Sequence, residues 1–189
     1  HSNEMKDMGG LRKFMPITHI TFLIACLAIA GIPPFSGFFS KDEILTACFR
    51  FSPVMGGLMT FIAGLTAFYM FRLYYNIFWA ASYRTHSEKG EDGVTQVPHE
   101  APASMTVPLI VLAVVTVVAG FLPFGEFVSS NGEAYHIHLD MKVAVTSVCV
   151  AVVAIVIAAL MYKGEKQTVA DKLAVSFKGL YRVAYRRFY

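Results

Sequence analysis

The chain has 189 residues, of which 56% are hydrophobic and only 15% are charged, and its formal net charge is +3. A soluble domain usually carries about 25% charged residues, so this composition argues against an ordinary soluble domain and indicates a chain whose solvent is lipid. The three cysteines lie far apart inside apolar runs, without the spacing of a metal or redox pair. We interpret them as small buried hydrophobic residues.

The first predicted element is an apolar region from about residue 14 to residue 48 that is interrupted in its middle. The interruption, residues 31–37, holds two glycines and two prolines in seven positions, which breaks a helix. We expect the helix to resume near Ser40. With Glu43 three positions later, Ser40 fits a capping box.

Three more apolar spans follow, at residues 54–79, 104–121 and 141–162. Each approaches the roughly 20 residues that a helix needs to cross a bilayer. Some are rich in valine and isoleucine, but their length favours helices over strands. The tail, residues 165–189, mixes basic with apolar and aromatic side chains and predicts an amphipathic helix on the membrane surface. An ordinary soluble helix is the alternative for the tail.

The distribution of charge predicts a topology. The loop of residues 123–140 carries three acidic residues and no lysine or arginine, whereas basic residues occupy the N-terminus, the preceding loop and the tail. If the interrupted region crosses once, the basic segments share one side, which the positive-inside rule makes cytoplasmic. A hairpin crossing twice would put the N-terminal basic residues outside and fits less well.

The predicted fold class is therefore all-α integral membrane, with about four transmembrane crossings, the first a helix broken at Gly31–Pro34. Residues 1–164 would form the membrane segment, and residues 165–189 would form a surface helix on the cytoplasmic side of a bacterial inner membrane. The sequence holds no phosphate-binding glycine loop, CxxC pair or nucleophile elbow. We expect no cofactor, no metal and no nucleic-acid partner for this chain.

Lys41 and Asp42, followed by Glu43, come directly after the break and are the main candidates for chemistry. Broken backbone at membrane depth survives only inside protein or beside water, and it recurs at ion and proton sites. Ionisable residues at that depth are functional candidates. Burial favours the neutral form of lysine, which would let Lys41 exchange a proton near neutral pH. The alternative places residues 41–43 at a water interface as a helix cap, and depth decides between the two.

His19 is a second candidate, as a proton relay. A lone histidine near a helix end is, however, more often hydrogen-bonded and structural. Arg72 stands among aromatic residues toward the end of the second span, which fits an aromatic belt with a snorkelling arginine. His136 and His138 are too few ligands to predict a metal site.

Three motifs then carry a resemblance to a known family: MetGlyGlyLeuArgLys (8–13), GlyIleProPro (31–34) and GlyPhePheSerLysAspGluIleLeu (37–45). They resemble the antiporter-like membrane subunits of NADH–quinone oxidoreductase, of the chain L type whose mitochondrial counterpart is chain 5 of complex I. The match continues more loosely through TyrMetPheArgLeuTyr (69–74) to the tail. Both ends of the sequence look cut, so we expect a C-terminal piece of such a subunit.

The resemblance implies a proton-translocating membrane subunit in which Lys41 belongs to the proton path and Asp42 is its neighbour. It implies other membrane subunits, lipid and protons as partners, with the redox chemistry of quinone reduction on other chains. It implies that the tail approaches a long surface helix that braces neighbouring subunits. Two alternatives stay open: a subunit of a cation/proton antiporter or membrane-bound hydrogenase, and a structural brace that does not pump.

Overall fold

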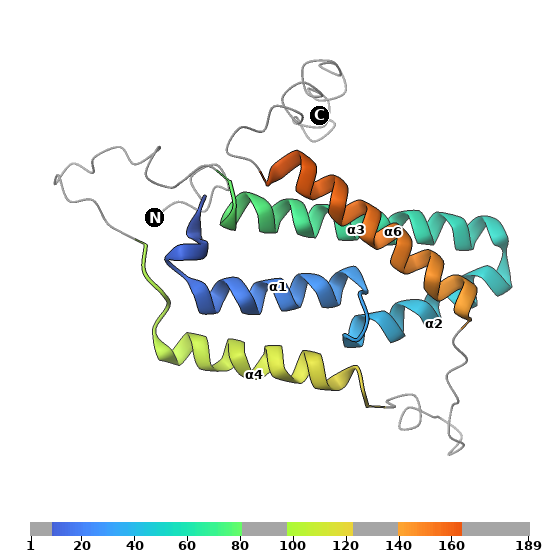
Figure 1. Ribbon diagram of the computed structural model, residues 1–189. Coiled ribbons are helices and arrows are strands. Elements are labelled where there is room, and N and C mark those ends of the chain that lie inside the picture. Colours follow the sequence, from blue (N-terminus) through green and yellow to red (C-terminus); the bar gives the residue numbers. More distant parts are fainter. Residues whose placement is uncertain (1–8, 81–97, 123–139, 164–189) are drawn as a thin grey trace, which may run out of the picture.

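The computed structural model describes residues 9–80, 98–122 and 140–163, and every regular element in these ranges is a helix (Figure 1). In chain order they are η2 (Leu11–Lys13), α1 (Pro16–Ala30), α2 (Ser36–Phe51), α3 (Pro53–Phe78), α4 (Ala103–Ala119) and α6 (Met141–Tyr162). The all-α prediction is confirmed, and the last three predicted spans match α3, α4 and α6 to within two residues. The predicted tail helix, His136 and His138 lie outside the described residues.

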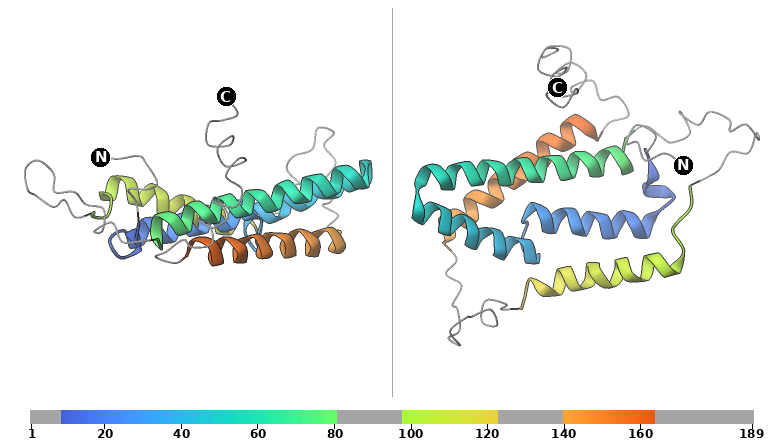
Figure 2. Two further views of the ribbon diagram at one scale, coloured as in Figure 1. Left: turned by 90° about the horizontal axis from the view of Figure 1, so that it is seen from above. Right: turned by 180° about the vertical axis from the view of Figure 1, so that it is seen from behind.

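The helices lie side by side in a layered bundle. α1 and α2 follow one another along the length of α3, which runs in the opposite direction, and α6 packs against α3 and runs parallel to it (Figures 1 and 2). α4 lies beside α1 and stops level with the break that separates α1 from α2. The start of α1, the start of α4 and the ends of α3 and α6 therefore share one end of the bundle, which we call the Trp79 end.

The break between α1 and α2 follows from local chemistry. Gly31 adopts a left-handed conformation, with φ of 79°, and ends α1 with hydrogen bonds from its own N–H to Ala28 O (3.1 Å) and from Ile32 N–H to Leu27 O (3.1 Å). This is the usual glycine ending of a helix. Two prolines follow and cannot donate backbone hydrogen bonds.

The predicted start of the second helix was wrong. α2 begins at Ser36, directly after the extended residue Phe35, and no side chain caps it. Ser40 lies inside the helix, where its Oγ donates to Gly37 O at 3.4 Å. The helix starts earlier than the capping pattern suggested because Phe35 is already extended after Pro34. Gly37 disfavours a helix on its own, but it is accommodated in α2, where it lets the backbone approach Ala28.

The length and surface of the helices suit a membrane, but they do not fix the number of crossings. α3 and α6, about 39 and 33 Å long at 1.5 Å per residue, are long and apolar enough to span a bilayer, whereas α1 and α4 are shorter apolar helices. Where helices touch, the buried residues are mostly small, as is usual between helices in lipid. They include Cys26, Ala30, Ala67, Ala151, Ala154 and Ala158. The four crossings stay a prediction.

Candidate functional site

Lys41 lies one turn after the start of α2 and reaches back across the break to α1. Its Nζ donates a hydrogen bond to the backbone carbonyl of Ile29 at 2.5 Å. Its stem passes Gly31 so closely that a Cβ at that glycine would lie 3.0 Å from Lys41 Cδ. The side chain is half-buried. The glycine that ends α1 therefore also makes room for the lysine that reaches over it.

The carbonyl that Lys41 binds is one of the last in α1. The final four carbonyls of a helix lack partners within the helix, and they give this end a partial negative charge that favours cations. Ala28 O and Leu27 O accept hydrogen bonds from the backbone of the break, and Ile29 O accepts a hydrogen bond from Lys41 Nζ. The lysine thus binds a carbonyl at the negative end of α1. Residues 41–43 themselves lie inside α2 and cap neither of its ends.

Asp42 points elsewhere. Neighbouring residues in a helix diverge by about 100°, and no ion pair joins Asp42 to Lys41 among the residues that the structure describes. Asp42 is only 1% exposed, and neither carboxylate oxygen has a hydrogen-bond partner within the described ranges. Thr46, one turn later on the same face, is 6% exposed with its hydroxyl likewise unpaired there.

Two glycines hold the helices around the break in backbone contact. A Cβ on Gly37 would lie 1.9 Å from the carbonyl oxygen of Ala28, so α2 crosses α1 at a distance that only glycine permits. A Cβ on Gly120, which follows α4, would lie 2.0 Å from the carbonyl oxygen of Pro34. The break is therefore fixed from two sides, by α1 and by the end of α4.

His19 lies in a different part of the bundle. It precedes Ile29 by ten residues on α1, which is about 15 Å along the helix axis, so the structure does not bring it to Lys41. Its Nε2 is hydrogen-bonded to the hydroxyl of Tyr74 at 2.7 Å, and its ring stacks on the Tyr74 ring. Trp79 Nε1 donates to the same hydroxyl at 3.2 Å, so the Tyr74 oxygen joins the side chains of His19 and Trp79.

Glu100 is a residue that the sequence did not single out. Its carboxylate accepts hydrogen bonds from Ile17 N–H at 2.8 Å and from the Thr18 hydroxyl at 2.6 Å, and so caps the start of α1 from a distant segment. Burial alone would raise the pKa of Glu100, but these hydrogen bonds and that of Ala101 N–H outweigh it, so the pKa lies below its usual value. No local motif signals a cap that is 83 residues away in the chain.

A second unforeseen cluster gathers at the end of α3. The guanidinium of Arg12 lies 3.9 Å from the centre of the Trp79 ring, and Lys163 Nζ lies 4.7 Å from it. Both distances are within the range of cation–π attraction. The sequence predicted an aromatic belt toward the end of this span, but it gave no means of pairing Trp79 with residues from the two ends of the described chain.

With this geometry in place, comparison with known proteins gives a consistent picture. Residues 1–67 match the family described as NADH:quinone oxidoreductase/Mrp antiporter, TM. The NAD(P)H-quinone oxidoreductase chain 5 of Picosynechococcus sp. is 40% identical over 213 residues, covering 100% of this chain and 32% of the relative. The chain 5 of Synechocystis sp. is 35% identical over 234 residues, covering 100% and 34%.

A chloroplast protein shows the same relationship. The NAD(P)H-quinone oxidoreductase subunit 5 of Chlorokybus atmophyticus is 34% identical over 197 residues, covering 100% of this chain and 30% of the relative. The chain therefore spans about a third of the length of the curated relatives it matches. The similarity extends along the whole chain, beyond the family match at its start.

Proposed function

Because the chain belongs to the antiporter-like membrane subunits of the NADH:quinone oxidoreductase and Mrp antiporter family, we propose that it forms part of the proton path of an NADH–quinone oxidoreductase. In this proposal Lys41 takes up and releases the proton, and Asp42 tunes it or carries the proton onward. The quinone chemistry takes place on other subunits, which are its partners in the membrane. The predicted cytoplasmic tail and the absence of cofactors belong to the same proposal.

The observation that carries the proposal is the bond between Lys41 and Ile29 across the helix break. It places a titratable cation against the negative end of α1. An amine there can hold its proton by hydrogen bonding to the carbonyl and can give it up, which an arginine in its place could not. Small movements of α1 against α2 would change this bond directly.

Asp42 adds a second proton-binding group on another face of α2. A carboxylate that is 1% exposed and without a partner in the described ranges is a costly arrangement in a folded protein, and it is relieved when the group takes up a proton. Lys41 and Asp42 together offer two successive proton positions that face different helices.

The chain 5 relatives favour the oxidoreductase over the antiporter and hydrogenase alternatives, because these relatives are NAD(P)H-quinone oxidoreductase subunits by name. Their sources also bear on location. A cyanobacterial or chloroplast relationship fits an energy-converting membrane without requiring the bacterial inner membrane that we predict. The membrane setting is common to all of them.

The experiment that tests the proposal replaces Lys41 in the full-length subunit within its assembled complex. Purified complex is reconstituted into vesicles, and proton translocation and quinone reduction are measured together. Lys41→Met removes the titratable group, and Lys41→Arg keeps the charge but not the ability to release a proton. Lys142→Met is the matched control, because Lys142 is exposed at the start of α6.

We expect Lys41→Met to lower proton translocation by on the order of a hundredfold, the lower range for removing a positioned proton-transfer group. Lys41→Arg should lower proton translocation by the same factor while the complex still assembles. Lys142→Met should translocate protons at the rate of the unmodified complex. If Lys41→Arg restores translocation, the lysine acts only as a fixed charge. If Lys41→Met translocates normally, Lys41 is no part of the path and the non-pumping brace becomes the better account.

A further inference from the structure

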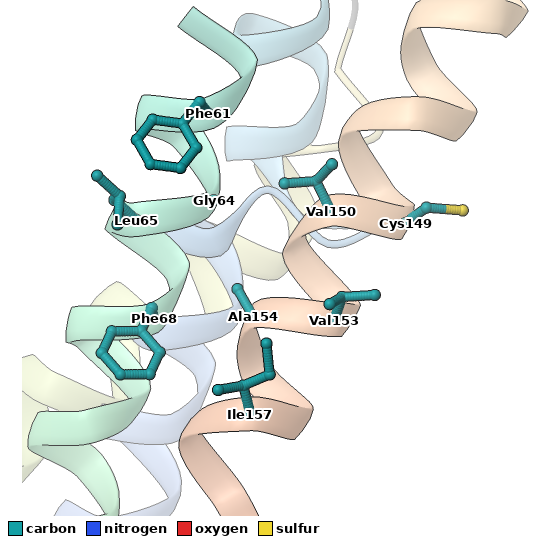
Figure 3. Close-up of a pocket in the computed structure, with 9 residues that line it drawn as sticks. All are labelled: Phe61, Gly64, Leu65, Phe68, Cys149, Val150, Val153, Ala154 and Ile157. Carbon is teal, nitrogen blue, oxygen red and sulfur yellow. The ribbon is translucent and has the colours of Figure 1, made fainter. Parts of the chain in front are cut away.

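An apolar groove runs between α3 and α6 and takes no part in the proton site. It has a volume of about 370 Å³, which is within the range of about 300–1,000 Å³ for small-molecule sites. Figure 3 shows that the lining residues come from two helices, α3 and α6, and that Val150, Ala154 and Ile157 of α6 point toward α3. The residues that line it are Phe61, Gly64, Leu65, Phe68, Cys149, Val150, Val153, Ala154 and Ile157.

One end of this groove leads to a cation. Phe61 and Phe68 lie on one face of α3, and Arg72 continues that face one turn further on, since residues four apart are neighbours on a helix surface. Phe68 packs edge to face against Tyr162, with ring centres 6.1 Å apart. The guanidinium of Arg72 lies 5.4 Å from the centre of the same tyrosine ring. The exposed Arg72 therefore lies directly beyond the apolar residues that line the groove.

Further positive charge surrounds this end. Lys163 follows Tyr162 and lies over Trp79, which Arg12 covers as well. Among the described residues no carboxylate pairs with Arg72, Lys163 or Arg12, and the nearby acid of the Trp79 end, Glu100, is engaged with the start of α1. The ends of α3 and α6 repel anions through their helix dipoles, so an anion here would depend on these cations.

We propose that the groove holds one acyl chain of an anionic phospholipid, whose phosphate lies against Arg72 and Lys163. The dimensions agree with this occupant. From Phe61 to Arg72 is about 16 Å along α3 at 1.5 Å per residue, close to half of the roughly 30 Å hydrocarbon thickness of a bilayer. Trp79 follows Arg72 at the end of α3, and tryptophan is enriched at the level of lipid headgroups. Basic pockets between membrane helices suit anionic headgroups for the same electrostatic reason.

The test uses the full-length subunit in its assembled complex, placed in lipid nanodiscs. The probe is phosphatidylglycerol with a photoactivatable group on one acyl chain, and phosphatidylcholine with the same chain is the zwitterionic comparison. After illumination, lipid adducts on the peptides of α3 and α6 are mapped by mass spectrometry. Arg72→Gln removes the proposed phosphate contact, and Arg50→Gln is the control, because Arg50 is an exposed arginine near the far end of α2.

A second pair of variants tests the groove without altering charge. Val153→Trp fills the groove, and Val152→Trp adds the same bulk at a neighbouring exposed valine that does not line it. Both positions face outward enough to accept a large side chain without disturbing the helix contact. A loss of adducts in the first variant alone locates the acyl chain in the groove, even if the arginine variant proves unstable.

We expect phosphatidylglycerol to label residues 61–68 and 149–157 more strongly than phosphatidylcholine. Arg72→Gln should lower the labelling about fivefold, the factor that corresponds to one basic residue at an anionic surface, and Arg50→Gln should leave it unchanged. The proposal would be overturned if both lipids labelled the groove equally and Arg72→Gln left the labelling unchanged. The groove would then be a lipid-facing surface without selectivity for the headgroup. Cross-links from these residues to protein in place of lipid would overturn it as well, because a neighbouring helix would be the occupant.

Discussion

Replacing Gly37 by alanine tests whether the close backbone crossing at the break positions Lys41. The added Cβ would lie 1.9 Å from Ala28 O and 2.9 Å from the carbonyl carbon. Both neighbours are backbone atoms of a helix, so neither can turn aside as a flexible side chain would. The two helices must separate by at least 1.1 Å before the oxygen contact reaches 3.0 Å.

That separation acts on the proposed site. Lys41 follows Gly37 by four residues, so it moves with the same face of α2. A displacement of this size takes the Lys41–Ile29 hydrogen bond from 2.5 Å toward the limit of hydrogen bonding, which is about 3.5 Å or less. Overpacking of this kind typically costs about 1–3 kcal/mol. We expect Gly37→Ala to lower both the thermal stability of the assembled complex and its proton translocation.

The control is Gly57→Ala in α3. A Cβ at Gly57 meets nothing within 4 Å, and alanine is favoured over glycine inside a helix by about 1 kcal/mol, so this variant should be as stable as the parent or slightly more so. The two variants are compared by thermal unfolding and by proton translocation in vesicles. Unchanged stability and translocation in Gly37→Ala would refute the reasoning, and equal damage in both variants would mean that any alanine harms the bundle.

Two further predictions concern the other contacts that fix α1 and the break. Gly120→Ala places a Cβ 2.0 Å from Pro34 O, and we expect it to lower the thermal stability by about 1–3 kcal/mol; a melting curve equal to the parent's would refute this. Glu100→Gln keeps an acceptor oxygen but removes the negative charge at the start of α1, and it should lower the free energy of unfolding at pH 7 by about 0.3–1 kcal/mol. Because the folded-state pKa of Glu100 is depressed, its stabilisation is complete above the unfolded pKa and is lost as the pH falls through the folded value. Parent and variant should therefore unfold at the same temperature once the pH lies below the folded-state pKa of Glu100, and a difference that persists there would count against the carboxylate cap.

The sequence predicted those features of the fold that depend on neighbouring residues. The apolar runs placed α3, α4 and α6, and the two prolines with their flanking glycines placed the interruption after α1. The start of α2 was missed by four residues, since the pattern of Ser40 and Glu43 occurs inside a helix as well as at its beginning. A capping motif indicates a helix start only where no earlier residue can already begin the helix.

The candidate site depended on contacts that no local pattern contains. The motif after the break marked Lys41 and Asp42, but the partner of Lys41 is a backbone carbonyl twelve residues earlier, and every residue carries such a carbonyl. The sequence marked His19 as a second candidate, a proton relay, with a hydrogen-bonded structural histidine as the alternative. The structure instead pairs His19 with Tyr74, which is 55 residues away in sequence. Distance along the chain gives no measure of such pairing.

Three contacts with backbone carbonyl oxygens meet at the break, and together they predict a mechanical role for it. Lys41 binds Ile29 O, Gly37 touches Ala28 O, and Gly120 touches Pro34 O. A displacement is transmitted through close-packed backbone because there is no free space between the atoms in which it could be absorbed. A shift of α4 would therefore reach the break at Pro34 and, through the start of α2, the bond that holds Lys41. Gly120→Ala should then alter proton translocation as well as stability, although Gly120 has no hydrogen bond to Lys41. If the break only relaxes around the new methyl group, proton translocation will stay unchanged, and this result would contradict the mechanical role.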